Sequence, residues 1–499
     1  MKLDNIRLDI DKSGICNLIL DTKSSEINVF NESVINDFIK ATEFILNNSE
    51  IIGIIISSAK ESFHDGYDLN YLYSLKFPKD IFETIYRLSK TLRRLETSGK
   101  TIVSAISGYT NLGGLELILH SHYKISDNSK NTKIIISNVK YDFCPNIGGT
   151  QRLPRLIGIS ETLDLLLKDE IISPKEALEK KLINKITEKT KLISECKKYI
   201  IDNKESLHPW DQKQNISPFS SKNLNYFISK IAMLHAENSD LYHSVKILIS
   251  CIFEGLNTDI NSGLKIEARH FTWLLNNKHN SSMIKTLKFG KPDKSFDKNE
   301  IESIKKSFEK NYAAEGVKLL IDGISPSLIE NAGKRIGFLN GPLASADKIE
   351  LQSIISELDS KDAPVAALIR SMQKSDRNGY SKRKGFYNYE KDKKLKIWNG
   401  LEELIPSSKK QPKVSEIEKR LLFSCINNIL FNYSKLSKLK NKIFYDYISI
   451  KEIGLPAWTG GPFTWIKNYD VKNFIKENAE YAKTLGSRFI INENILKEI

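Results

Sequence analysis

Apolar residues in the first 190 positions alternate between short continuous runs and helical spacings. Residues 51–56 and 102–106 form runs of the first kind, which are typical of strands buried on both faces. Apolar positions within residues 34–45 follow the helical period, and the Ser-Pro-Lys-Glu sequence at Ser173 indicates a capped helix start. Because strands alternate with helices, we predict a layered α/β domain in this part of the chain.

After residue 190 the pattern becomes helical. Residues 203–222 are polar and contain two prolines, as in a linker, whereas residues 223–289 carry apolar residues at helical spacing. Further on, the sequence around Gly337 and Pro342 is echoed around Gly454 and Pro462, and each copy follows a helix with an apolar face. This echo predicts two related helical units. The predicted segments are 1–190, 191–299, 300–400 and 401–499.

Composition excludes several classes of function. The net charge is +14, but lysines are mixed with acidic residues and no arginine cluster with interleaved aromatics occurs, so we do not predict a nucleic-acid partner. The five cysteines are far apart and odd in number, which argues against a disulfide framework or a metal site. The start of the chain does not resemble a signal peptide, and no apolar run reaches membrane-spanning length. We therefore expect a cytoplasmic protein.

The candidate chemistry lies in residues 101–160. An apolar strand runs into a turn at Gly108, and Gly113 then opens a helix that carries Glu116. A strand that ends in glycines and feeds a helix can direct free backbone N–H groups at an oxygen that bears negative charge. With a carboxylate one turn into the helix, the stretch predicts a site that polarises a carbonyl and moves a proton beside it.

Several motifs in order then resemble the crotonase (enoyl-CoA hydratase/isomerase) family. They are Gly108-Tyr109, residues 113–117, Pro145 to Arg155, Ile172 to Leu178, and the turn at residues 63–68. The resemblance implies a crotonase spiral of ββα repeats over residues 1–190. The linking helices of 191–299 and the helical units 300–400 and 401–499 resemble the multifunctional α-subunit of fatty-acid oxidation, whose last two segments are 3-hydroxyacyl-CoA dehydrogenase C-terminal repeats.

The resemblance also implies roles for individual residues. The backbone N–H groups of Tyr67 and Gly113 would hold the thioester oxygen, and Glu116 would be the first of two catalytic glutamates. The second position is Asn138, which cannot donate and recover a proton. Loss of a general acid or base typically costs about 10²–10⁴-fold in rate. The predicted CoA-binding turn consists of His64, Asp65, Gly66 and Asp68.

Other residues near this site have less direct interpretations. Asp142 is the nearest acid that could substitute for the missing glutamate, and Asn146 stands where other crotonases place an acid. We expect His64 to be a surface turn residue and Asp68 to cap a helix. Tyr67 occupies a position where a small residue is common, so its ring is expected to narrow the pocket.

One domain of the family pattern is absent from the sequence. No GxGxxG motif occurs, and the roughly ten residues near 290–300 are too few for a βαβ unit, which needs about 30. We therefore expect no NAD binding, no other cofactor and no dehydrogenase activity. The function implied is 2-enoyl-CoA hydration of an acyl-CoA substrate, weakened by Asn138.

Two alternatives remain open. One is a non-catalytic CoA-thioester-binding or scaffold subunit of an oxidation complex, and the other is a different crotonase reaction, such as thioester hydrolysis or isomerisation. The helical units would support a homodimer or a thiolase partner. Fold-level analogy does not by itself determine the chemistry.

Overall fold

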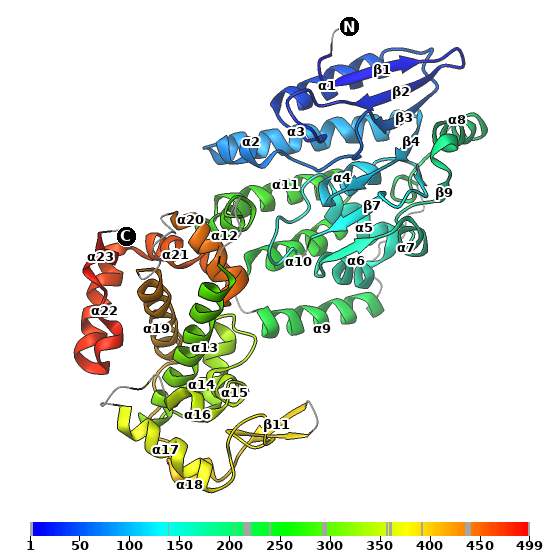
Figure 1. The fold of residues 1–499 in the computed structure, drawn as a ribbon. Helices are drawn as coiled ribbons and strands as arrows, with labels where there is room; N and C mark the ends of the chain where they lie inside the picture. The colour runs from blue at the N-terminus through cyan, green and yellow to red at the C-terminus, as the bar shows by residue number, and fades with distance from the viewer. Residues whose placement is uncertain are drawn as a thin grey trace. The chain divides into compact units, whose positions relative to one another are not determined.

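The computed structural model describes residues 3–137, 139–204, 206–212, 221–238, 241–291, 297–355, 358, 362–390, 393–434 and 441–497. The chain divides into two compact units (Figure 1). The first contains residues 1–236 and 242–277, and the second contains residues 237–241 and 278–499. The four segment boundaries expected from the sequence stay predictions.

Two sheets form the framework of the first unit. The larger has the strand order β1-β2-β3-β4-β6-β9; β1 pairs antiparallel with β2, and every later neighbour is parallel. The smaller sheet has the order β5-β7-β8. The strands are β1 (Ile6–Ile10), β2 (Ile15–Leu20), β3 (Gly53–Ser58), β4 (Thr101–Ile106), β5 (Tyr109–Thr110), β6 (Tyr123–Asp127), β7 (Lys133–Ile136), β8 (Glu170–Ile172) and β9 (Lys185–Thr187). The continuous apolar runs are thus the central parallel strands β3 and β4, as predicted.

Helices cover these sheets. Helix α8 packs on the larger sheet, where Cys196 and Ile200 meet Ile55 and Val103 in one apolar cluster. Helices α10 and α11 pack against each other, and α11 also contacts α3 and α5. The helices are α1 (Glu32–Leu46), α2 (Leu69–Ser74), α3 (Pro78–Glu96), α4 (Leu112–Leu119), α5 (Gly149–Ile157), α6 (Ile159–Leu166), α7 (Pro174–Glu179), α8 (Leu192–Asp202), α9 (Ser221–Asn238), α10 (His243–Leu256) and α11 (Ile260–Asn276). The capping box predicted at Ser173 is confirmed at the start of α7.

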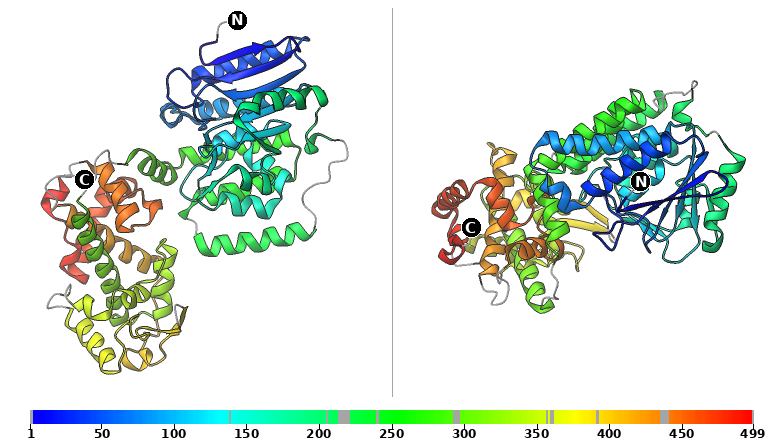
Figure 2. Two further views of the ribbon diagram at one scale, coloured as in Figure 1. Left: turned by 45° about the vertical axis from the view of Figure 1, so that its right-hand side comes forward. Right: turned by 90° about the horizontal axis from the view of Figure 1, so that it is seen from above.

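The second unit is a set of helices around one apolar core, with a single two-stranded hairpin among its described residues (Figure 2). The hairpin consists of β10 (Tyr387–Glu390) and β11 (Lys393–Ile397). The helices are α12 (Lys278–Phe289), α13 (Lys298–Ile321), α14 (Pro326–Arg335), α15 (Pro342–Lys348), α16 (Leu351–Ile355), α17 (Ala363–Lys374), α18 (Leu401–Leu404), α19 (Val414–Tyr433), α20 (Lys442–Ile448), α21 (Pro462–Tyr469), α22 (Val471–Leu485) and α23 (Glu493–Leu496).

The sequence echo has a counterpart in the caps of two helices. Glu330 of α14 accepts the N–H groups of Leu343 and Ala344, the two residues after the proline that begins α15. Asp446 of α20 does the same for Phe463 and Thr464 at the start of α21. In both copies, a buried carboxylate satisfies the free N–H groups of a helix that begins with proline. Their relation to dehydrogenase repeats stays a prediction.

Candidate active site

Glu116 is fixed at the centre of the first unit by three backbone hydrogen bonds. It lies in α4, whose neighbouring side chains are buried, and only 1% of the residue is exposed. Its Oε2 accepts the N–H of Asn146 at 3.2 Å, and its Oε1 accepts those of Ile147 and Gly149, each at 2.7 Å. The loop that leads into α5 therefore wraps around this carboxylate, which also benefits from the positive end of that helix.

A second buried carboxylate, Glu267 of α11, binds the other N–H groups of the same loop. Its Oε1 accepts the N–H of Gly148 at 2.5 Å, and its Oε2 accepts the N–H of Thr150 at 2.9 Å and the hydroxyl of that residue. Sequence reasoning missed Glu267. The available signal was an acid in line with Leu264 and Phe271, at positions that place all three on the buried face of one helix.

The two carboxylates influence each other's protonation. Burial raises the pKa of Glu116, and the negative charge of Glu267 raises it further, against the lowering effect of the three N–H donors. Burial also raises the pKa of Glu267, while its bonds to Thr150 and Gly148 lower it. A carboxyl group whose pKa is moved towards neutrality can both accept and release a proton under physiological conditions.

Two free backbone N–H groups lie where the turn at residues 64–68 meets the start of α4. Neither the N–H of Tyr67 nor that of Gly113 donates to any residue that the structure describes. The two backbone segments approach closely, since a Cβ on Gly113 would lie 2.5 Å from the Cα of Gly66. Gly66 itself has a φ of +98°. Only glycines permit this approach. The structure thus brings together the two N–H groups expected to form an oxyanion hole.

The rest of this turn is held by packing and hydrogen bonds. His64 is buried, contrary to the expected surface position, because the ring of Phe30 packs on it with centroids 4.2 Å apart. Its Nδ1 accepts the N–H of Gly66 at 2.9 Å, and burial lowers its pKa to about 3, so the ring is neutral. Asp68 caps α2 as predicted. Asp65 accepts a hydrogen bond from the amide of Asn111, which joins the turn to the helix start.

Three residues were expected at or near the position of the second glutamate. Asn138 lies outside the described residues. Asp142, the candidate substitute acid, accepts the N–H of Phe143 at 2.7 Å. Asn146 belongs to the loop itself: its backbone N–H donates to Glu116, and its side chain donates to the Cys144 carbonyl at 3.3 Å.

A buried ion pair joins α5, the helix that follows this loop, to α3. Arg152 of α5 is completely buried and donates to Glu96 of α3 through Nη2 at 2.5 Å and Nε at 3.2 Å. Arg93 and Trp210 also contact the Glu96 carboxylate, at 3.2 Å and 3.3 Å. Burial alone would raise the pKa of Glu96, but Arg152, together with His120 and His208, holds that pKa well below its usual range. A paired charge of this kind fixes helix position because either partner alone would be costly to bury.

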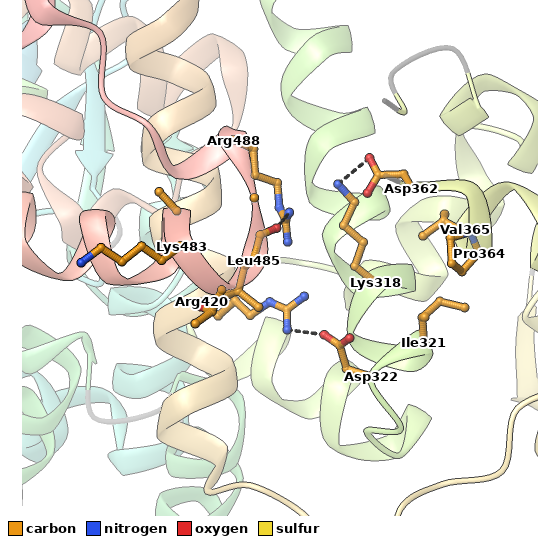
Figure 3. A pocket seen from close by; sticks show the side chains of 13 residues that line it. Lys318, Ile321, Asp322, Asp362, Pro364, Val365, Arg420, Lys483, Leu485 and Arg488 are labelled. Carbon is orange, nitrogen blue, oxygen red and sulfur yellow. Dashed lines mark hydrogen bonds and ion pairs between the residues drawn. The ribbon is translucent and has the colours of Figure 1, made fainter. Parts of the chain in front are cut away.

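The second unit has a charged cavity of about 300 Å³, shown in Figure 3. Lys318 pairs with Asp362 at 3.0 Å, and Arg420 pairs with Asp322 at 2.6 Å. Arg420 and Arg488 also share the buried carboxylate of Glu315. Because three of its cations are matched by acids, we assign these residues to the packing of the helices and not to a ligand.

The described residues contain neither a membrane-spanning helix nor a cluster of metal ligands. They contain no helix that is long and apolar enough to cross a membrane. In the same parts of the chain, no group of three or more His, Cys, Asp or Glu residues is placed to hold a metal ion.

Comparisons with known proteins agree with the geometry of the first unit. Residues 11–207 match the family model described as enoyl-CoA hydratase/isomerase. The chain is similar to the fatty acid oxidation complex subunit alpha of Shewanella frigidimarina, with 28% identity over 277 residues, 54% of this chain and 39% of the relative. The corresponding protein of Shewanella baltica strain OS155 is 27% identical over 274 residues, with the same two coverages. The chain thus spans well under half the length of these curated relatives.

Solved structures of similar proteins include the enoyl-CoA hydratase of Bacillus anthracis, which is 19% identical, with 57% of this chain and 96% of that one covered and a TM-score of 0.36. For the enoyl-CoA hydratase of Bacillus halodurans the identity is 20%, the coverages are 54% and 99%, and the TM-score is 0.37. By this match, residues 11–207 are similar to the enoyl-CoA hydratase/isomerase, or crotonase, family. The chain is a crotonase-fold domain followed by a mostly helical region.

Proposed function

We propose that the first unit binds a 2-enoyl-CoA and adds water to its double bond, as a hydratase of fatty-acid β-oxidation. The observation that carries this proposal is the position of Glu116, a buried carboxylate with a raised pKa that is fixed beside the start of α4. The free N–H groups of Tyr67 and Gly113 lie at the same helix start. The family match and the names of the relatives support the substrate class.

The chemistry follows from these groups. The N–H groups of Tyr67 and Gly113 hold the thioester oxygen, which makes the β-carbon electrophilic and stabilises the enolate by several kcal/mol. Glu116 accepts a proton from the attacking water. The expected turn at His64, Asp65, Gly66 and Asp68 keeps the first N–H in place, and the buried His64 acts through the backbone. Because Asn138 is neutral, the rate should fall below that of a site with two glutamates by about 10²–10⁴-fold unless another group donates the proton.

The test is the loss of conjugated thioester absorbance when the protein is mixed with crotonyl-CoA and with longer 2-enoyl-CoAs. We expect turnover that Glu116→Gln reduces by at least about 100-fold, because the amide cannot act as a base. Glu254→Gln is the matched control: this carboxylate is half exposed and pairs with His270 on the outer side of α10 and α11. Equal rates for wild type and Glu116→Gln would contradict the proposal.

The neutral Asn138 also favours a second candidate, a CoA-thioester-binding subunit without hydratase activity. Binding of crotonyl-CoA without turnover would support that role, and release of free CoA thiol would indicate thioester hydrolysis instead. No dehydrogenase activity is proposed for this chain, and a titration with NADH should show no saturable binding in the micromolar range. A homodimer and a thiolase partner remain proposals that co-purification and sedimentation would test.

A further inference from the structure

We propose that the phenol of Tyr67 donates the proton to the α-carbon of the substrate, in place of the missing second glutamate. This inference rests on the proposed hydratase function. Tyr67 is 9% exposed, and its hydroxyl oxygen is buried without a hydrogen-bond partner among the described residues. Buried hydroxyl groups are nearly always paired because an unpaired one loses its bonds to water. An unpaired hydroxyl in this place is therefore a candidate for a bond to substrate.

The location of Tyr67 supports this role. Its own N–H is one of the two free groups of the candidate oxyanion hole, so the side chain leaves the backbone next to the position of the thioester. The ring packs on Phe30, with centroids 5.8 Å apart, and Phe30 forms a β-bridge with Tyr67 that fixes the turn. Packing against Phe30 limits the rotamers of the Tyr67 ring. Proton transfer requires a donor that is held in one position.

The charges around the phenol keep it protonated. Burial raises its pKa well above the usual value, and the nearby Glu116 carboxylate raises it further, as do Tyr71 and Glu267, while Arg87 lowers it. Among the charged groups, the one with the largest effect on the pKa of the phenol is thus the same carboxylate that is assigned as the base. In the proposed step, one proton passes between these two groups.

The step balances with these two groups alone. Glu116 takes a proton from water as the water oxygen bonds to the β-carbon, and the electrons of the double bond move to the thioester oxygen. When the carbonyl re-forms, the α-carbon bonds to the hydroxyl proton of Tyr67, which leaves a phenolate. The protonated Glu116 then returns its proton to that phenolate. The net change is the addition of one water, with no oxidant and no further reactant.

Tyr67→Phe is the sharp test because it removes only the hydroxyl and keeps the ring and the backbone N–H. We expect the kcat for crotonyl-CoA hydration to fall by about 10²–10⁴-fold, as for loss of a general acid. The Kd of butyryl-CoA, a saturated analogue that needs no proton, should stay within about twofold, since removal of one unpaired group leaves the ground-state contacts in place. Thermal unfolding should be unchanged or shifted upwards, because the hydroxyl has no partner to lose.

Tyr199→Phe is the matched control, since Tyr199 of α8 stacks on Tyr123 of the larger sheet, with ring centroids 3.8 Å apart, and is not part of the proposed site. This variant should keep wild-type kcat. If wild type hydrates crotonyl-CoA and Tyr67→Phe is equally fast, the ring only shapes the pocket and the inference is wrong, while the proposed function stands. If wild type itself shows no hydration, both are wrong.

Discussion

In the proposed reaction, the asparagine at the second acid position, Asn138, changes how protons must move. Glu116 is held beside the loop by three N–H groups. With an asparagine at the second position, one carboxylate has to serve a reaction in which one proton leaves water and another reaches carbon. A site in this condition can still bind and polarise the thioester, because those tasks belong to the backbone N–H groups.

Restoring the acid tests this interpretation. We expect Asn138→Glu to raise the kcat for crotonyl-CoA hydration by at least about tenfold, since a positioned general acid is typically worth about 10²–10⁴-fold. The gain should be larger when Tyr67→Phe is also present, because the new carboxyl group would then replace a missing proton donor and not duplicate the Tyr67 phenol. Steady-state rates of the four proteins measure both effects. A rate that does not change with Asn138→Glu, either in wild type or in Tyr67→Phe, would show that the pocket has diverged beyond its acid.

For single residues, the sequence predicted contacts between positions that are close together along the chain. Glu116 and Gly113 belong to one short motif, so their geometry follows from a strand, a turn and a helix. Glu267 could not be found in this way, because its partners lie more than 100 positions earlier. The surface position expected for His64 is wrong for the same reason, since it is the distant Phe30 that covers the ring.

At the scale of elements, α4 and α11 hold one loop from two directions. The N–H groups of residues 146–150 are divided between Glu116 and Glu267, so the carboxylate of the crotonase motif is positioned partly by a helix outside residues 11–207, the part matched by the family model. Helix α11 is thus part of the site. The sequence did predict helices in this region, but helical periodicity does not show which loop a buried acid contacts.

Glu267→Gln should alter the pH dependence of the reaction. Glu116 acts as a base only when deprotonated, and its pKa is raised by burial and by the charge of Glu267, so activity is lost as the pH falls through this raised value. Without that charge the pKa of Glu116 falls. The acid limb of kcat/KM for crotonyl-CoA should therefore move to lower pH.

Glu254→Gln is the control: its carboxylate lies on α10 and pairs with His270 of α11. The pH profile of kcat/KM for this variant should match that of wild type. Stopped assays between pH 5 and pH 9 would resolve the limb. A Glu267→Gln profile that coincides with wild type would mean that the two carboxylates do not interact during catalysis and that Glu267 serves only to anchor the loop.

For the whole molecule, the apolar pattern distinguished a region of mixed strands and helices from a helical one, and both are present. It could also detect the echo between the two Gly-Pro helix starts, since a proline at the first turn is a local signal. The acids that cap these helices, Glu330 and Asp446, were not predicted. Each comes from the preceding helix, and only the packing of that helix brings the carboxylate to the free N–H groups.

The cap at Asp446 predicts how the second unit responds to substitution. Asp446→Ala leaves the N–H groups of Phe463 and Thr464 without their acceptor, which should lower the free energy of unfolding of this unit by about 1–3 kcal/mol. Burial raises the pKa of Asp446 to about 7 from an ordinary value of 3.8, so its stabilising contribution is full below pH 4 and is lost as the pH rises through 7. The destabilisation should therefore be larger at pH 5 than at pH 8.

Urea unfolding followed by tryptophan fluorescence measures this difference, since Trp465 lies in the helix that Asp446 caps. Glu480→Ala, an exposed position on α22, is the control and should leave the midpoint unchanged at both pH values. Crotonyl-CoA hydration should be unaffected by either variant, because both carboxylates of the proposed site lie in the first unit. Loss of hydration in folded Asp446→Ala would mean that the helical unit is needed for catalysis. Equal destabilisation at the two pH values would mean that Asp446 is charged at both pH 5 and pH 8.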